Sequence, residues 1–231
     1  MALRYPALVL VFLLLPVQAD GHGGGLDGQG GHVDRRTGEY HCHREPCFSL
    51  HQQQRDAEEE AREEGRPYSR LYDRDDWPHW VDDNGNCLDA RAEELARSSL
   101  EPVEFHEHNE CLVASGKWKD PYTGELHHVA RDLDMDHLVP LRHAHGHGGD
   151  RWSRDRRRRF ANDPDNLVAV SASQNRSKGY RGPDEWLPPN EDYWCEYGRR
   201  WSAVKERYEL MVTPPEEQAL EKMAATCDET P

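Results

Sequence analysis

Residues 134–178 contain three short segments whose order constrains the fold more than any other feature of the chain. The first begins DMDHLVPL, where Pro140 breaks a short apolar run, as is typical of a strand that ends in a turn. The second, NLVAV at 166–170, is apolar and β-branched and predicts another strand. Ser171 then predicts the N-cap of a short helix that Gly179 would end. The expected unit is two strands and a helix, with a long insertion between the strands.

Polar residues stand at fixed places in this unit. Asp136 and His137 lie together at the end of the first strand, Asn166 opens the second, and Asn175 and Lys178 share the helix. This order resembles that of the HNH endonucleases, whose ββα-metal finger is built in the same way. The step from Asn166 to Asn175, followed by RSKG, is similar to the corresponding part of the HNH domain in CRISPR effector nucleases.

The resemblance extends outside the finger to secreted bacterial HNH nucleases, over residues 70–227. The matching frame includes GKWKDPYTGE, DMDHLVPL, FANDPDNLVAVSASQNRSKG, EWLPPN and YWCEYGRRW. The resemblance implies an α+β fold in which a ββα-metal finger is embedded in a mostly helical, disulfide-stapled domain.

The resemblance also implies a role for each polar residue in phosphodiester hydrolysis, which needs a nucleophilic water and a cation at the phosphate. His137 is the expected general base, because an imidazole with an ordinary pKa of ~6.5 accepts a proton at neutral pH. Asp136 and Asn175 are the expected ligands of a divalent cation, Mg²⁺ in the first place, with Mn²⁺, Ca²⁺ and Zn²⁺ left open. Asn166 is expected to orient the histidine, and Lys178 to contact a phosphate or the transition state.

Three points in this assignment stay open. In a regular strand Asp136 and His137 would point to opposite sides, although strand ends and turns relax that alternation. Asp134 either supports the metal site or forms a hydrogen bond at the strand end. Lys178 is alternatively a solvated lysine at the C-terminal end of a helix, where a positive charge is favourable.

Basic residues concentrate around this unit although the chain is acidic overall. Residues 112–182 hold 13 Lys and Arg against 9 Asp and Glu, whereas the whole chain holds 29 against 44, a formal net charge of −15. The segment RWSRDRRRRF predicts a helix on which Arg156 and Arg159 lie three residues apart. Together with Arg176, they are the expected contacts to the phosphate backbone of a nucleic acid. Because no segment resembles a base-reading element, we expect cleavage with little sequence specificity.

Three more histidines follow His137 and alternate with Ala and Gly. The two glycines that come next favour a loop. We therefore expect His143, His145 and His147 to line the approach to the site or to lie in solvent, and we exclude them from catalysis. An additional metal site is the alternative.

The first nineteen residues are typical of a secretory signal peptide, with Arg4, an apolar run at 7–15 and small residues at the expected cleavage site. The run is shorter than the ~20 residues that span a bilayer, so we expect export and no membrane contact after removal of the leader. The chain has six cysteines, all beyond this leader, and an even number favours disulfides in an oxidising compartment. Sequence proximity favours the pairs Cys42–Cys47, Cys87–Cys111 and Cys195–Cys227.

Residues 20–50 form a small module rich in Gly, His and Asp, without the apolar periodicity that builds a core. A metal, a disulfide or both must hold it together. The stretch GGLDGQGGHVDRRTGEYHCHR resembles a small His-rich motif of exported bacterial proteins. His32, Asp34, His41 and His43 are candidate ligands for Zn²⁺ or a related transition metal. The alternative is a disulfide-closed loop with solvated histidines.

The predicted organisation is a signal peptide at 1–19, the His-rich module at 20–50, an acidic polar linker or helix at 51–67, and a nuclease domain at 68–228. Periodicity predicts helices within 88–100, 194–211 and 219–227. The stretch CLVAS at 111–115, followed by GKWKDPYTGE, predicts a strand, a turn and a second strand.

Together these features predict a secreted, divalent-metal-dependent HNH endonuclease that hydrolyses DNA, with RNA left open as a second substrate. The alternative is a non-enzymatic exported protein that binds metal through its His-rich segments. The sequence leaves the oligomeric state open.

Overall fold

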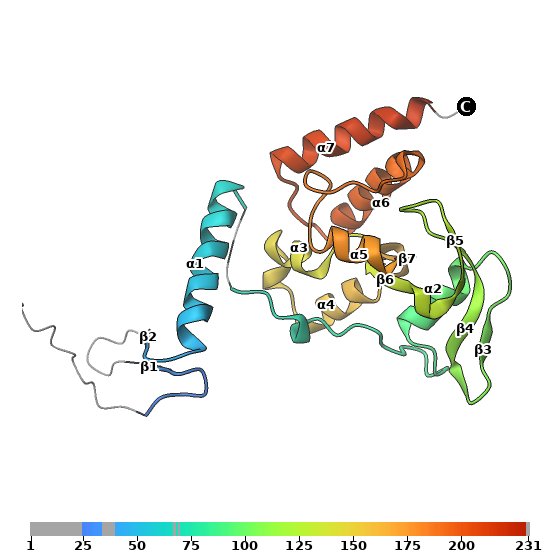
Figure 1. The fold of residues 1–231 in the computed structure, drawn as a ribbon. Coiled ribbons are helices and arrows are strands. Elements are labelled where there is room, and N and C mark those ends of the chain that lie inside the picture. The colour runs from blue at the N-terminus through green and yellow to red at the C-terminus, as the bar shows by residue number, and fades with distance from the viewer. Residues whose placement is uncertain (1–24, 34–39, 67, 69, 230–231) are drawn as a thin grey trace, which may run out of the picture. The chain divides into compact units, whose positions relative to one another are not determined.

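The computed structural model describes residues 25–33, 40–66, 68 and 70–229. The chain divides into two compact units, Met1–Gln52 and Gln53–Pro231 (Figure 1). The expected signal peptide at 1–19 lies outside the described residues.

The first unit contains a two-stranded antiparallel sheet of β1 (Gly31–Val33) and β2 (Tyr40–Cys42). The helix α1 (Cys47–Glu63) begins in this unit and ends in the next. The polar stretch that the sequence left open as linker or helix is therefore helical over most of its length.

The next α-helix of the second unit is α2 (Ala90–Ser98), whose N-cap Asp89 accepts a hydrogen bond from the backbone N–H of Ala92. A three-stranded antiparallel sheet follows, in the order β3 (Glu104–His106), β4 (Asn109–Lys119) and β5 (Leu126–Val129). The strand predicted at 111–115 is part of the longer β4, and residues 120–125 join β4 to β5.

A second, two-stranded antiparallel sheet pairs β6 (Leu133–His137) with β7 (Leu167–Ser171). The insertion between its strands holds α3 (Leu141–Gly146) and α4 (Arg154–Ala161). The short helix α5 (Ala172–Lys178) follows β7 directly and ends at Gly179, whose φ is +60°. The predicted order of strand, insertion, strand and helix is confirmed.

The domain closes with a pair of helices, α6 (Trp194–Arg207) and α7 (Pro214–Ala225). Thr213 and Glu216 form a capping box at the start of α7, each side chain satisfying a backbone N–H of the other. Short 3₁₀ turns complete the unit at Arg74–Asp76, Ala130–Asp132, Gly149–Arg151, Pro164–Asn166, Glu191–Tyr193 and Thr226–Glu229.

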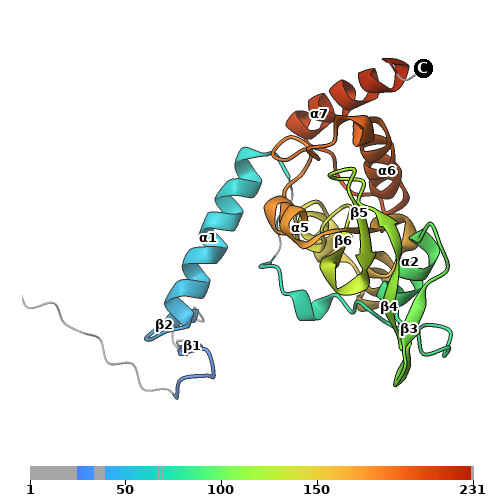
Figure 2. The same cartoon turned by 45° about the vertical axis from the view of Figure 1, so that its right-hand side comes forward.

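The β6–β7 sheet separates two hydrophobic clusters, because alternate residues of a strand point to opposite faces. One face contributes Leu133, Met135, Leu167 and Ala169 to a cluster with α2 and β4. The other face contributes Val168 and Val170 to a larger cluster with α3, α4, α6 and α7. Figure 2 shows α2 and α5 on opposite sides of β6. A polar residue on β6 therefore belongs to one of two different environments.

The structure forms all three disulfides that sequence proximity favoured, Cys42–Cys47, Cys87–Cys111 and Cys195–Cys227. With its small sheets and many helices it also confirms the α+β class. Within the described residues, no helix combines the length and the apolar character that crossing a membrane requires.

Candidate active site

The strand β6 distributes its polar residues over both faces of the small sheet. Asp134 pairs with Val170 and Asp136 with Val168 in the antiparallel register, whereas His137 pairs with Leu167. The two aspartates are therefore on the face that α5 covers, and His137 is on the face toward α2. Successive side chains of β6 therefore alternate between the two faces of the sheet up to its last residue, His137.

On the α5 side, Asn175 and Lys178 each contact an aspartate of β6. The amide Nδ2 of Asn175 donates to Asp134 Oδ2 at 3.1 Å. The ammonium of Lys178 donates to Asp136 Oδ2 at 2.6 Å and to the backbone carbonyl of His137 at 2.8 Å. The hydroxyl of Tyr122 donates to the same Asp136 oxygen at 2.7 Å. The helix α5 therefore lies against both aspartates of β6, and Lys178 has a partner other than the one predicted for it.

Lys178 has a carboxylate as its partner in place of the phosphate that the sequence predicted. Its side chain is fully buried, and Asp136 is 4% exposed. Burial raises the pKa of the Asp136 carboxyl, while Lys178 opposes this rise. Burial lowers the pKa of Lys178, and Asp136 opposes that shift in turn. Each charge of the pair thus depends on the other for its stabilisation.

His137 lies in a different setting on the opposite face. Its Nε2 donates to the backbone carbonyl of Ala161 at 2.8 Å, because a carbonyl only accepts. The indole of Trp80 stacks on the imidazole, with ring centroids 5.3 Å apart and an interplanar angle of 21°. Burial lowers the pKa of His137 to about 3. The ring is therefore neutral at physiological pH, with its proton on Nε2 and its lone pair on Nδ1.

Trp80 reaches this position through an unusual backbone conformation. Its φ is +56°, in the left-handed region that a bulky residue rarely occupies. Such a conformation costs on the order of 1–3 kcal/mol and persists only where the surrounding structure imposes it. The stacking on His137 is the contact that this conformation produces.

Asn166 fixes the loop that follows His137. Its Oδ1 accepts from the backbone N–H of Val139 at 2.8 Å, and its Nδ2 donates to the carbonyl of Val139 at 3.2 Å. Its own carbonyl accepts from the backbone N–H of Leu138 at 2.8 Å. The side chain is fully buried and acts on the loop, through which it holds the end of β6.

The predicted phosphate-binding arginines differ in their surroundings. Arg156 donates to the carbonyl of Tyr208 and to Glu209 Oε2, so its guanidinium fastens α4 to the segment after α6. Arg159 and Arg176 are exposed, and Arg176 is the neighbour of Asn175 on α5. These two retain the accessibility that contact with a phosphate backbone requires.

The expectation of a loop with accessible histidines at 143–147 is wrong. The segment forms α3, and all three histidines are buried. His143 and His147 are four residues apart, which on a helix places them on one face, where their rings stack with centroids 3.8 Å apart. The His–x–His alternation resembled a strand period, whereas Pro140 before the helix and Gly148 after it, at φ +113°, define a helical turn.

His143, His147 and Glu216 lie close enough together to hold a metal ion. A lysine already supplies the positive charge: the ammonium of Lys205 donates to both Glu216 oxygens at 2.6 Å and to His143 Nε2 at 3.2 Å. Burial lowers the pKa of His143 to about 4 and that of Lys205 to about 8. Although burial alone would raise it, His143 and Lys205 hold the pKa of Glu216 well below its usual range. We therefore treat this cluster as structural.

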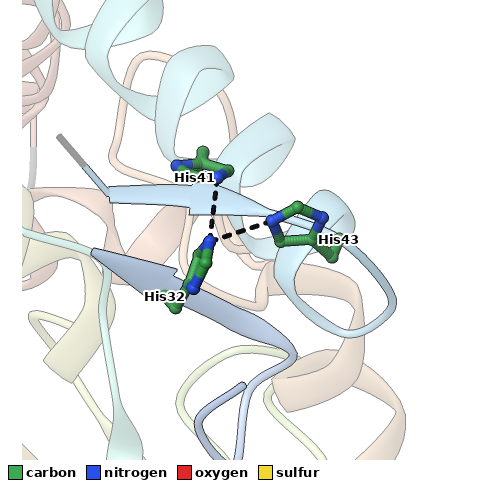
Figure 3. A group of neighbouring side chains, drawn as sticks. All are labelled: His32, His41 and His43. Carbon is green, nitrogen blue, oxygen red and sulfur yellow. Dashed lines mark hydrogen bonds between the residues drawn. The ribbon is translucent and has the colours of Figure 1, made fainter. Parts of the chain in front are cut away.

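Of the four predicted ligands in the first unit, three are brought together. His32, His41 and His43 gather on the β1–β2 sheet, with His32 Nε2 at 3.0 Å from His41 Nε2 and 3.1 Å from His43 Nε2 (Figure 3). Asp34 lies outside the described residues.

Sequence reasoning missed two side chains that contact the site and one that lies near it. Tyr122 stands in the DPYTG stretch of the matching frame, which was the available signal for it. Trp80 carried no signal, because its stacking depends on a loop that precedes His137 by more than fifty residues. Arg74 is exposed and close enough for its charge to contribute to the lowered pKa of His137. It is a further cation near the face that carries His137.

The fold and these side chains define a domain built on two strands and a helix, with an aspartate–asparagine pair on one face and a neutral histidine on the other. Residues 87–223 match the family described as GmrSD restriction endonucleases, C-terminal domain. The match takes in more than half of the chain, including β6, β7 and α5, and the chain belongs to this family.

A protein of Arthroderma benhamiae described as an uncharacterized secreted protein is 40% identical over 158 residues, which cover 68% of this chain and 76% of the relative. No solved structure matches the chain. The family supports nuclease activity and a nucleic-acid substrate in general.

Proposed function

We propose that the second unit is a secreted HNH endonuclease that hydrolyses phosphodiester bonds of DNA with the help of a divalent cation and with little sequence specificity. RNA is a second substrate to be tested. The observation that carries the proposal is the arrangement around β6, in which oxygen ligands and a neutral imidazole stand at the same strand end but on opposite faces.

The donor atoms on the α5 side fit Mg²⁺. Because the carboxylate of Asp134 can only accept, it holds Asn175 by the amide nitrogen and leaves the amide oxygen available as a ligand. Both contacts to Asp136 fall on Oδ2, which leaves Oδ1 available. Proteins usually bind Mg²⁺ through one or two side-chain oxygens, and water and substrate oxygens complete its coordination. Such a cation supplies charge compensation for the scissile phosphate and the departing oxygen.

Burial lowers the pKa of His137 to about 3, and the negative charge of a bound phosphate would raise it toward the range in which His137 can take a proton from the attacking water. Its Nε2 proton is committed to the carbonyl of Ala161, which leaves Nδ1 as the basic atom. The stacked indole of Trp80 holds the ring in this orientation. Asn166, which fixes the backbone just after the histidine, is a positioning residue in this account.

The separation of Asp136 and His137 suits in-line displacement at phosphorus. In that reaction the attacking oxygen and the departing oxygen lie on opposite sides of the phosphorus atom. We propose that the phosphate lies beyond the end of β6, where His137 and the cation ligands could reach it from two sides.

Lys178 positions Asp136 in this account. Its ammonium joins the carboxylate to the carbonyl of His137, so it ties together the two residues with the central roles. Arg176 on α5, Arg159 on α4 and Arg74 before Trp80 are the exposed cations proposed to contact the phosphate backbone. Since such contacts release counterions, binding should weaken steeply with added salt.

Export is supported by two observations. The three disulfides persist most readily in an oxidising compartment, and the relative from Arthroderma benhamiae is described as secreted.

The test is cleavage of supercoiled plasmid and of RNA by the full chain with Mg²⁺, Mn²⁺, Ca²⁺ or Zn²⁺. We expect nicking and linearisation by the wild type, and a loss of about 10²–10⁴-fold in His137→Ala. The matched control is His128→Ala, which removes an exposed histidine of β5 and should leave the rate unchanged. A wild type that leaves both substrates intact with every cation would overturn the proposal.

A further inference from the structure

The β1–β2 sheet of the first unit brings three imidazoles to one point. Figure 3 shows the rings of His32, His41 and His43 converging from the two strands and the segment after β2. The Nε2 atom of His32 lies 3.0 Å from Nε2 of His41 and 3.1 Å from Nε2 of His43. His32 is buried, His41 is half-buried and His43 is exposed, so the group is reachable from solvent on one side.

The register of the strands produces this convergence. His32 and His41 are directly paired across the antiparallel sheet, where facing side chains are ~5 Å apart. His43 follows two residues after His41 and therefore points to the same face. A shift of one residue in either strand would send the histidines to different faces.

Hydrogen bonding alone satisfies this arrangement poorly. An imidazole Nε2 has either one hydrogen or one lone pair, so it can make one good hydrogen bond and not two. His32 Nε2 nevertheless has two imidazole nitrogens within 3.1 Å. Three ring nitrogens that all lie within 4.8 Å of one another can share a cation, each through its lone pair.

The spacing is close to what a transition metal needs. With a Zn–N distance of about 2.0–2.1 Å and tetrahedral angles, two ligand nitrogens lie about 3.3 Å apart. The observed 3.0 and 3.1 Å are only a few tenths of an ångström shorter. A small rotation of the exposed His43 ring and the half-buried His41 ring would be enough to lengthen these nitrogen–nitrogen distances to about 3.3 Å.

The hairpin is also held in place around the three rings. Cys42, between His41 and His43, forms a disulfide with Cys47 at the start of α1. The carbonyl of Gly30 accepts from the backbone N–H of His43 at 3.0 Å. Gly30 has φ +91°, and a Cβ there would lie 2.6 Å from the Arg44 side chain, so this close approach requires glycine. A fixed backbone reduces the entropy that metal binding would otherwise cost.

We propose that His32, His41 and His43 form a binding site for a divalent late transition metal, with Zn²⁺ as the expected ion. Imidazole nitrogens suit Zn²⁺ and its neighbours, whereas Mg²⁺ prefers oxygen ligands. Water completes the coordination of the ion. The site lies outside the matched family region at 87–223 and does not depend on nuclease activity.

The test uses the full chain, stripped with a chelator and titrated calorimetrically with Zn²⁺ in excess Mg²⁺. We expect one strongly bound equivalent in the wild type, lost in His32→Ala and weakened at least tenfold in His43→Ala. His128→Ala and Asp136→Ala, which alter the second unit, should retain it. The proposal fails if the wild type binds no zinc, or if His32→Ala binds it as tightly as the wild type does.

A second measurement keeps the proposal testable if a variant misfolds. X-ray absorption of the zinc-loaded wild type should give nitrogen or oxygen neighbours at about 2.0–2.1 Å, with the outer-shell scattering of several imidazoles. Sulfur ligands would instead implicate Cys42 and Cys47, and a shell without imidazole would implicate carboxylates. Either result would overturn the assignment.

Discussion

Replacing Asn166 by alanine should be one of the most destabilising single changes near the candidate active site. The side chain makes two hydrogen bonds to the backbone of Val139, at 2.8 and 3.2 Å, and both residues are fully buried. The variant leaves one N–H and one C=O without partners, and each such buried group costs about 1–3 kcal/mol. The expected loss is therefore about 2–5 kcal/mol.

Urea denaturation monitored by tryptophan fluorescence measures this loss. All seven tryptophans lie beyond Gln52, so the signal reports the second unit alone. With a dependence of about 1–3 kcal/mol per molar urea, the midpoint should fall by on the order of 1 M.

Asn175→Ala is the matched comparison, because it removes one hydrogen bond from a half-buried site. It should cost under about 1 kcal/mol of stability and still abolish cleavage. An Asn166→Ala protein as stable as Asn175→Ala would refute the role given to Asn166.

The remaining predictions concern the buried cluster and the α6–α7 staple. Burial lowers the pKa of His143 to about 4, so the folded state stays neutral while the unfolded chain takes up a proton near pH 6.5. The contribution of neutral His143 to the free energy of unfolding is therefore fully present above about pH 6.5, and it falls by about 1 kcal/mol per pH unit toward pH 4. Urea titrations at several pH values should show a smaller slope in His143→Gln. Lys205→Met leaves the Glu216 carboxylate buried without its cation and should cost about 3–5 kcal/mol in the same assay, most of which the double variant with Glu216→Gln regains. Opening the Cys195–Cys227 disulfide, which spans 32 residues, should lower the free energy of unfolding by about 3–4 kcal/mol. The Tm measured with reductant should therefore be lower than the Tm measured without it.

Local features of this chain could be predicted from sequence because they depend on neighbouring residues. The strand at 166–170, the helix that Ser171 begins, and the disulfide pairs follow from residue type and proximity. The resemblance to HNH nucleases implied that Asn166 orients His137, and in the structure its side chain fixes the backbone of Val139 in the loop that follows.

What the sequence could not provide were partners that are distant along the chain. The buried state of His143 depends on Lys205 and Glu216, more than sixty residues later, so a local pattern of His and Gly suggested a loop. Similarly, the contact of Tyr122 with Asp136 requires the β4–β5 turn to pack against the second sheet. Such contacts are decided by tertiary packing and not by periodicity.

The central claim is that His137 acts as the general base for phosphodiester cleavage, and chemical rescue tests it most directly. The full chain carrying His137→Gly is assayed on supercoiled plasmid in Mg²⁺, with and without added imidazole. We predict a loss of about 10²–10⁴-fold that imidazole partly restores, whereas Asp136→Ala is inactive and gains nothing from imidazole. Full activity of His137→Gly without imidazole would contradict the account.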